Sequence, residues 1–175
     1  VEFDFADVME RVQRVVKTIE PHDSAERFTQ LGVECIEGEG KIVSPWEVEI
    51  RAEDGQARRL TTRSIVIAAG ARPYVPPIPG LEEVPYLTNE VVFNLNEPVP
   101  SLIIIGAGPI GIEMAQAFCR LGSKVCVVDL VPNILPKEDL DASDVVRKQL
   151  EHEGVKFYLG VAPQKVEGGK GDIRF

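Results

Sequence analysis

A glycine loop with the spacing Gly-x-Gly-x-x-Gly, at 106–111, joins an aliphatic run at 101–105 to a helical pattern at 112–118. In such a loop the first glycine allows a tight turn, the second lets the backbone approach a pyrophosphate, and the third lets the helix pack closely on the strand. The positive end of the helix then faces the phosphates. This order predicts a dinucleotide-binding unit, with a glycine-rich turn that binds nothing as the alternative. The predicted binding residues are Gly106, Gly108, Pro109, Ile110 and Gly111.

An acidic residue, Asp129, ends a second strand pattern at 124–128. It follows the loop at about the ~20-residue offset at which a carboxylate accepts hydrogen bonds from ribose hydroxyls. A carboxylate would repel a 2′-phosphate, and the segment Leu130–Asn133 contains no Arg or Lys that could hold one. The sequence therefore favours NAD over NADP. A solvated aspartate that only caps the strand end is the alternative.

The composition excludes several classes of function. The 175 residues are 44% hydrophobic with a net charge of −9, which indicates one or two globular domains and argues against a nucleic-acid surface. No apolar run approaches the length of a membrane span. The glycine loop makes small-molecule nucleotides the expected partners.

The cysteines, Cys35, Cys119 and Cys126, lack Cys-x-x-Cys spacing, so neither a zinc site nor a disulfide framework is predicted. A reducing cytoplasm is expected, with Cys119 and Cys126 in the core.

The first part of the chain has a mixed pattern. Apolar residues at three- and four-residue spacing from Phe5 to Ile19 predict an amphipathic helix, with Asp4 as N-cap and the whole apolar stripe in the core. Trp46 is interpreted as a packing residue, and His22 as a helix-entry residue rather than a base. The other predicted elements are a helix at Ser24–Leu31 that Gly32 stops, a strand at Val33–Glu37, an antiparallel meander at 41–43, 46–50 and 58–60 with a turn at Asp54–Gly55, and a buried parallel strand at Ser64–Ala69.

Prolines divide the chain, with a connector at 76–80 and a domain boundary at 98–100, directly before the strand of the glycine loop. Beyond Asp129, a loop at 133–136 precedes a predicted helix and a third parallel strand. These elements make half of a doubly wound α/β domain. The helix is expected at Asp141–His152 with Val145, Val146 and Leu150 inward, the strand at Val155–Leu159, and a further antiparallel excursion from Gln164 to Phe175.

Four ordered motifs together resemble the FAD-dependent pyridine nucleotide-disulfide oxidoreductases, in the branch of mercuric reductase and dihydrolipoamide dehydrogenase. The motifs are Thr62–Pro73, Pro79–Gly80, Leu87–Glu90 and Gly106–Glu113. The resemblance covers nearly the whole chain and implies an α/β fold. Residues 1–98 would be the C-terminal part of an FAD-binding domain, with a parallel strand and a small meander, and 99–175 the N-terminal part of an NAD-binding Rossmann domain.

The resemblance also implies roles for individual residues. Ala69 and Gly70 would lie beside FAD, and the stretch Gly38, Glu39, Gly40 would meet its adenine; an ordinary strand-end turn is the alternative for these positions. Glu113 would orient the nicotinamide for hydride transfer, or would simply be a charge favoured by the helix dipole. Pro109 stands where some members of the family carry a gating tyrosine, so no such gate is expected here.

Several family features are absent from this sequence: the Gly-x-Gly-x-x-Gly for the FAD phosphate, the redox-active Cys-x-x-x-x-Cys, and the C-terminal interface domain with its His-Glu pair. We therefore expect a middle piece of an NADH-dependent flavoprotein in which hydride passes from NADH to FAD and on to a cysteine pair. The complete protein would bind FAD and form a homodimer, and the piece alone would not turn over. The alternatives are a non-catalytic dinucleotide-binding module and a flavoenzyme of the NADH oxidase or ferredoxin reductase type.

Overall fold

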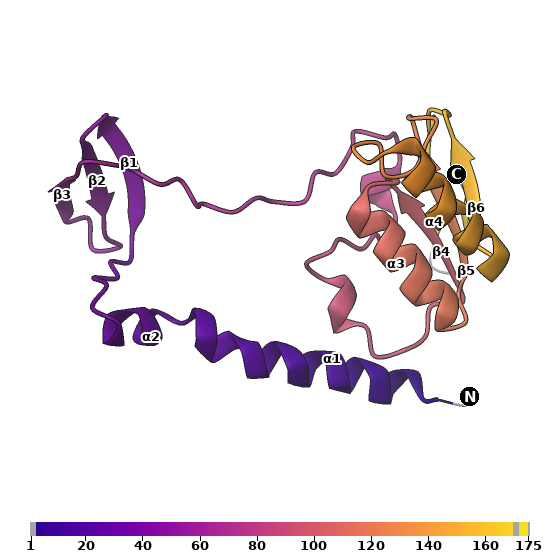
Figure 1. Cartoon of the computed structure of the whole chain (residues 1–175), viewed down its shortest axis with the longest axis horizontal. Helices are drawn as coiled ribbons and strands as arrows, with labels where there is room; N and C mark the ends of the chain where they lie inside the picture. The colour runs from indigo at the N-terminus through magenta and orange to yellow at the C-terminus, as the bar shows by residue number, and fades with distance from the viewer. Residues whose placement is uncertain (1–2, 170–171, 175) are drawn as a thin grey trace. The chain divides into compact units, whose positions relative to one another are not determined.

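The computed structural model describes residues 3–169 and 172–174, which form two compact units. One unit contains the described residues up to Gln13 and from Pro73 onward, and the other is Arg14–Arg72. Figure 1 labels helices α1 to α4 and strands β1 to β6 along the chain. The predicted boundary between residues 98 and 99, which would separate an FAD-binding domain from an NAD-binding domain, stays a prediction. None of the described helices is both long and apolar enough to cross a membrane.

Helix α1 (Phe5–Ile19) begins as predicted, because the N–H of Ala6 donates to Oδ1 of Asp4 at 2.8 Å. Phe5 and Met9 are buried in the core of the first unit. The prediction that the whole stripe is buried was wrong, since the second half, with Val16 and Ile19, is about half exposed. Apolar spacing identifies the face of a helix, but burial also requires a partner along its full length.

In the second unit, η1 (Glu20–Asp23), a short 3₁₀ helix that contains the exposed His22, leads to α2 (Ala25–Gln30). The N–H of Arg27 donates to Oγ of Ser24 at 3.2 Å, and Gly32 follows with φ +87°, so the predicted helix and both of its ends are confirmed. The predicted strand at Val33–Glu37 was wrong. This segment pairs with no described strand, and the first strand starts only at Glu39.

The predicted meander is confirmed as the antiparallel sheet β1-β2-β3. Its strands are β1 (Glu39–Ser44), β2 (Glu47–Arg51) and β3 (Ala57–Thr61). At the predicted turn, Gly55 has φ +83° and the N–H of Gln56 donates to Oδ1 of Asp54 at 2.9 Å. Trp46 lies at the bend between β1 and β2 and is 61% exposed, so its assignment as a packing residue was wrong.

The predicted buried strand at Ser64–Ala69 does not form in this chain. The segment is neither helix nor strand, no described strand pairs with it, and Val66 and Ile67 are 87% and 77% exposed. A buried parallel strand requires hydrogen-bonding neighbours and layers on both faces. The sequence pattern shows that the segment suits such a position, and the described residues do not supply the neighbours.

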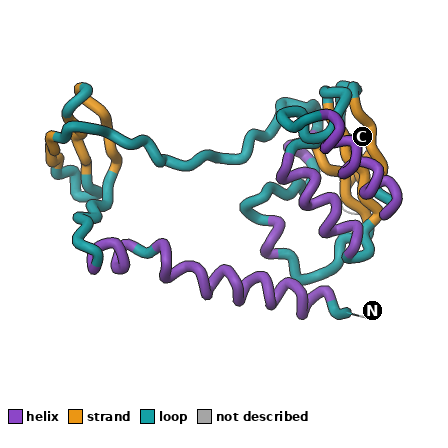
Figure 2. The backbone as a smooth tube through the Cα atoms, in the orientation of Figure 1, coloured by secondary structure: helices purple, strands orange, loops and turns teal. Residues whose placement is uncertain are grey.

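The parallel half-domain is confirmed in the first unit. Strands β4 (Ser101–Ile105), β5 (Lys124–Asp129) and β6 (Lys156–Leu159) form one parallel sheet in the order β4-β5-β6. Helix α3 (Pro109–Arg120) connects β4 to β5, and α4 (Leu140–Glu153) precedes β6. Figure 2 shows this alternation of strand and helix. All three strands therefore end at the same edge of the sheet, the edge at which open α/β sheets bind ligands.

The core of this unit lies between the sheet and its helices. Val127 of the central strand, Ala115 of α3 and Leu150 of α4 are fully buried. Leu150 and Val146 face inward as predicted, but Val145 is 70% exposed, so that part of the prediction was wrong. Residues 146 and 150 are one helical turn apart on one face, whereas 145 lies about 100° away from 146.

A second apolar cluster, Ile78, Leu81, Val84 and Val166, holds the proline connector. The connector is loop up to the 3₁₀ helix η2 (Leu81–Glu83), followed by a second 3₁₀ helix, η3 (Val92–Asn94), and the break at 98–100. The predicted C-terminal excursion is confirmed as an antiparallel pair, β7 (Glu167–Gly169) and β8 (Asp172–Arg174). Residues 170–171 and 175 of that prediction lie outside the described residues.

Candidate dinucleotide-binding site

The turn after β4 depends on two of the three glycines for its own geometry. Gly106 has φ +112°, and its N–H donates to the carbonyl of Val128 at 2.9 Å, which extends the parallel ladder by one residue. A Cβ on Gly111 would lie 2.1 Å from the carbonyl oxygen of Gly106. Helix α3 can start this close to the strand only because residue 111 has no side chain.

Gly108, in contrast, is not needed for the internal packing of the loop. It has an ordinary φ of −74°, and a Cβ there would meet no atom of the chain within 4 Å. No side chain caps α3, and within residues 3–169 and 172–174 the N–H groups of Gly108, Ile110 and Gly111 have no hydrogen-bond partner. Pro109, the first residue of the helix, has no N–H to offer. The helix start is therefore open and donor-rich, as an anion site requires.

Asp129 lies directly beside the glycine loop. Its Oδ2 accepts a hydrogen bond from the N–H of Ala107 at 2.6 Å, and its Oδ1 accepts one from Val131 at 3.1 Å. The side chain is half-buried at the end of β5. Each carboxylate oxygen keeps a further lone pair for a ribose hydroxyl. The structure thus brings the predicted loop and the predicted acidic residue together at one edge of the sheet.

The loop after Asp129 is hydrogen-bonded both to the glycine loop and to the residue that follows β6. The N–H of Leu135 donates to the carbonyl of Ala107 at 2.8 Å, and the N–H of Gly160, which follows β6, donates to Val131 at 2.9 Å. Ala107 is fully buried and is bonded through both its N–H and its carbonyl. Sequence reasoning missed Ala107 and Leu135, because neither residue type signals a backbone contact of this kind.

Comparison with known proteins identifies the family. The family described as pyridine nucleotide-disulphide oxidoreductase matches residues 5–174. The chain belongs to this family. It is 33% identical over 162 residues to a dihydrolipoyl dehydrogenase of Chlorobaculum tepidum, covering 91% of this chain and 34% of the relative. It is 31% identical over 171 residues to a mercuric reductase of Bacillus cereus, covering 98% of this chain and 26% of the relative.

Among solved structures, the chain is similar to the Cu(II) complex of the HOCl-induced flavoprotein disulfide reductase RclA from Escherichia coli. The TM-score is 0.78 at 27% sequence identity, over 97% of this chain and 38% of that chain. These similarities confirm the predicted oxidoreductase family, its mercuric reductase and dihydrolipoamide dehydrogenase branch, and the α/β fold class. The chain spans only about a third of the length of these relatives.

The family resemblance assigned Glu113 to the nicotinamide. Glu113 is the fifth residue of α3, one turn beyond the open helix start, and it is exposed. The part of the chain that the structure describes contains no hydrogen bond or ion pair of its carboxylate. The alternative of a charge in the first helical turn does not hold at this position, because the helix begins at Pro109.

The residues that the resemblance places near FAD belong to the second unit and do not form a comparable site. Gly38 has φ +153°, and a Cβ there would lie 2.6 Å from the carbonyl of Arg51, so the packing of the sheet already requires this glycine. Glu39 and Gly40 begin β1. Ala69 ends the unpaired segment and Gly70 follows it, and no hydrogen bond between described residues joins them to 38–40. This chain alone therefore shows no fit for a flavin, and the flavin contacts stay predictions.

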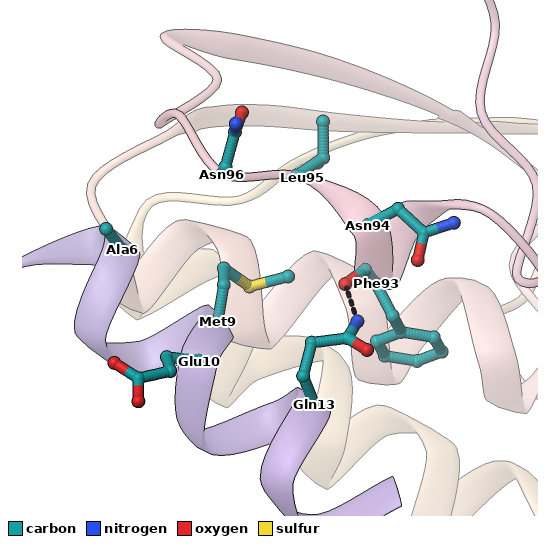
Figure 3. A pocket seen from close by; sticks show the side chains of 8 residues that line it. All are labelled: Ala6, Met9, Glu10, Gln13, Phe93, Asn94, Leu95 and Asn96. Carbon is teal, nitrogen blue, oxygen red and sulfur yellow. Dashed lines mark hydrogen bonds between the residues drawn. The ribbon is translucent and has the colours of Figure 1, made fainter. Parts of the chain in front are cut away.

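The first unit also contains a pocket of about 320 Å³. It separates the start of α1 from the segment 93–96, and Figure 3 shows Gln13 donating through Nε2 to the carbonyl of Phe93, at 2.7 Å. Its lining residues are Ala6, Met9, Glu10, Gln13, Phe93, Asn94, Leu95 and Asn96. None of them is a predicted site residue.

The three cysteines form no disulfide in the part of the chain that the structure describes. All three are free thiols, and burial raises the pKa of the Cys126 thiol above its usual range. The Cys119 thiol donates to the carbonyl of Glu153 at 3.3 Å. Among the described residues, no group of His, Cys, Asp and Glu side chains is arranged to hold a metal ion.

Proposed function

We propose that this chain is the nicotinamide-nucleotide-binding part of an NADH-dependent flavoprotein oxidoreductase, in which hydride passes from NADH to FAD and on to a cysteine pair outside this chain. Its relatives named dihydrolipoyl dehydrogenase and mercuric reductase support this reaction class. The chain contains no pair of cysteines with the family spacing, so we expect it to bind the nucleotide without turning over by itself.

The observation that carries the proposal is the pairing of Asp129 with the glycine loop. The carboxylate is held 2.6 Å from the N–H of Ala107, next to a glycine that the packing does not require and a helix start with free donors. A bound dinucleotide would place its pyrophosphate against the N–H groups of Gly108, Ile110 and Gly111 and its ribose hydroxyls against Asp129.

The same geometry favours NADH over NADPH. A 2′-phosphate carries about two negative charges and would meet the negatively charged Asp129. The residues that follow, Leu130–Pro136, include no Arg or Lys that could offset this repulsion. When bound, the nicotinamide and flavin would supply the hydride chemistry, while this chain would bind and orient the nucleotide.

Glu113 is the residue proposed to orient the nicotinamide. One turn along α3 from the phosphate donors, its exposed carboxylate points to no partner among the described residues and is free for one. In the flavin-loaded protein, a Glu113→Gln variant should show slower reduction of the flavin by NADH at an unchanged Kd for NADH. An unchanged rate of flavin reduction would remove this role.

The nucleotide assignment is tested by titrating the 175-residue chain with NADH and with NADPH and following nicotinamide fluorescence. We expect NADH to bind at least ~10-fold more tightly, which corresponds to about 1.4 kcal/mol. An Asp129→Asn variant keeps an acceptor for Ala107 but loses the charge, so it should weaken NADH binding and narrow the gap to NADPH. Equal affinity of the unchanged chain for both nucleotides would contradict the assignment.

The second candidate is a dinucleotide-binding module that works without a flavin. The contact between the glycine loop and Asp129 supports it, because this candidate site uses residues of the first unit alone. A visible flavin spectrum of the protein purified from its natural source would exclude this candidate. A colourless protein that still binds NADH would support it.

A further inference from the structure

Leu135 has an unusual backbone conformation for its residue type. Among the described residues it is the one non-glycine residue with a positive φ, at +49°. A branched apolar side chain pays a steric penalty in this left-handed region, where Gly and Asn are tolerated. Leu135 also precedes Pro136, which biases a residue towards extended conformations. Such a conformation persists only where surrounding interactions hold it.

Three hydrogen bonds hold Leu135 in this conformation. Its N–H donates to the carbonyl of Ala107 at 2.8 Å. Its carbonyl accepts from the N–H of Glu138 at 2.9 Å and from Oγ of Ser143 at 3.4 Å, and Ser143 is a buried polar residue of α4. The torsion angles of residue 135 set the angle between these two peptide planes, so the left-handed turn lets one residue bond to the glycine loop and to α4 together.

The bond to Ala107 acts on the middle of the candidate site. Ala107 lies between the two glycines of the turn, and its own N–H donates to Asp129. The carbonyl of Ala107 is therefore held by Leu135, and its N–H is held by Asp129. A shift at Leu135 would move the turn relative to the free N–H groups at the start of α3 and relative to the carboxylate of Asp129.

We propose that Leu135 is a positioning residue for dinucleotide binding, because its left-handed backbone fixes the glycine loop against Asp129. The proposal rests on the proposed nucleotide binding for its functional consequence, but the placement of the loop can be measured without a ligand. The side chain of Leu135, which is half-buried at the edge of the core, contributes less than the backbone conformation.

Two substitutions separate backbone conformation from side-chain bulk. Leu135→Asn removes the apolar side chain but accepts the left-handed conformation, whereas Leu135→Ile keeps the volume but disfavours that conformation strongly. The measurements are the hydrogen exchange rate of the Ala107 amide by NMR and the Kd for NADH, both on the 175-residue chain. The amide of Val127 in the central strand is the internal control, because it reports on the sheet rather than on the loop.

We expect Leu135→Ile to speed exchange at Ala107 roughly tenfold and to weaken NADH binding by a similar factor, with exchange at Val127 unchanged. Leu135→Asn should keep both values within about twofold of the unchanged chain. The opposite order, with Asn harmful and Ile neutral, would mean that the side chain acts only by packing and would overturn the proposal. So would two variants that behave alike.

If Leu135→Ile does not fold, Ser143→Ala tests the same link, since it removes one hydrogen bond to the Leu135 carbonyl within a helix that tolerates alanine. Faster exchange at Ala107 would then support the proposal, and unchanged exchange would refute it. Should the unchanged chain bind no NADH, the proposed function fails, while the exchange rates still decide whether Leu135 positions the loop.

Discussion

The two units contain similar apolar runs that reach different structures. In the first unit, the run at 101–105 becomes β4, which pairs with β5 and is covered by α3. In the second unit, the run at 64–69 forms no strand and is largely exposed, since no described strand pairs with it. The difference shows that a strand in a parallel sheet is specified by its neighbours as much as by its own residues.

The largest expected effect concerns the glycine loop, where helix α3 packs closely on strand β4. Gly111→Ala would place a Cβ 2.1 Å from a backbone oxygen that no rotamer change can move, so we expect a loss of about 3 kcal/mol in the free energy of unfolding. Urea denaturation followed by circular dichroism measures it. Gly40→Ala in the second unit meets no atom within 4 Å and is the matched control, expected within about 0.5 kcal/mol.

Gly108→Ala completes that comparison within the loop itself. Since no atom of the chain lies within 4 Å of a Cβ at this position, stability should change little. The added methyl group would enter the space that the proposed function assigns to the pyrophosphate, so NADH binding should weaken. If Gly108→Ala destabilised the fold as much as Gly111→Ala, or if it left NADH binding untouched, the division of roles between the glycines would be wrong.

A smaller effect on the free energy of unfolding is expected when one buried valine of the parallel sheet and one exposed valine of the run at 64–69 are each replaced by alanine. Val127 in the central strand is fully buried, so Val127→Ala should cost about 2 kcal/mol in the free energy of unfolding. Val66 is 87% exposed, so Val66→Ala should change it by less than about 0.5 kcal/mol. Both follow from the same denaturation experiment. A large loss from Val66→Ala would show that the run at 64–69 is buried in solution after all.

Local patterns predicted the glycine loop, the parallel half-domain and the meander, because those elements find their partners within a few dozen residues. The same patterns failed at Val33–Glu37 and Ser64–Ala69, where propensity was present and a pairing strand was not. They also overestimated burial of the second half of α1. Leu135 was beyond sequence reasoning for another reason, since its conformation opposes the preferences of both leucine and a residue before proline.

The smallest expected effects concern two carboxylate–arginine pairs, one in each unit. Glu153 joins α4 to α3: its carboxylate accepts from Nε and Nη2 of Arg120 at 2.8 and 2.7 Å and from Nε2 of Gln149 at 2.8 Å. The hydrogen bonds from Arg120 are the main reason that the pKa of Glu153 falls to about 2. Glu34 has a lowered pKa through Arg58 alone, and both of these side chains are more than half exposed.

Because the folded protein holds both pKa values below that of an unfolded glutamate, the unfolded state binds more protons in acid, and stability falls as the pH falls. For Glu153 this contribution is complete above about pH 4.5 and is lost as the pH approaches 2. Glu153→Gln should therefore flatten the acid side of a plot of thermal midpoint against pH, with no change in slope near pH 7. Glu34→Gln should leave the curve nearly unchanged, since an exposed pair contributes little. If both variants flattened the curve equally, the ion pair between α3 and α4 would contribute no more to stability than the exposed pair in the second unit.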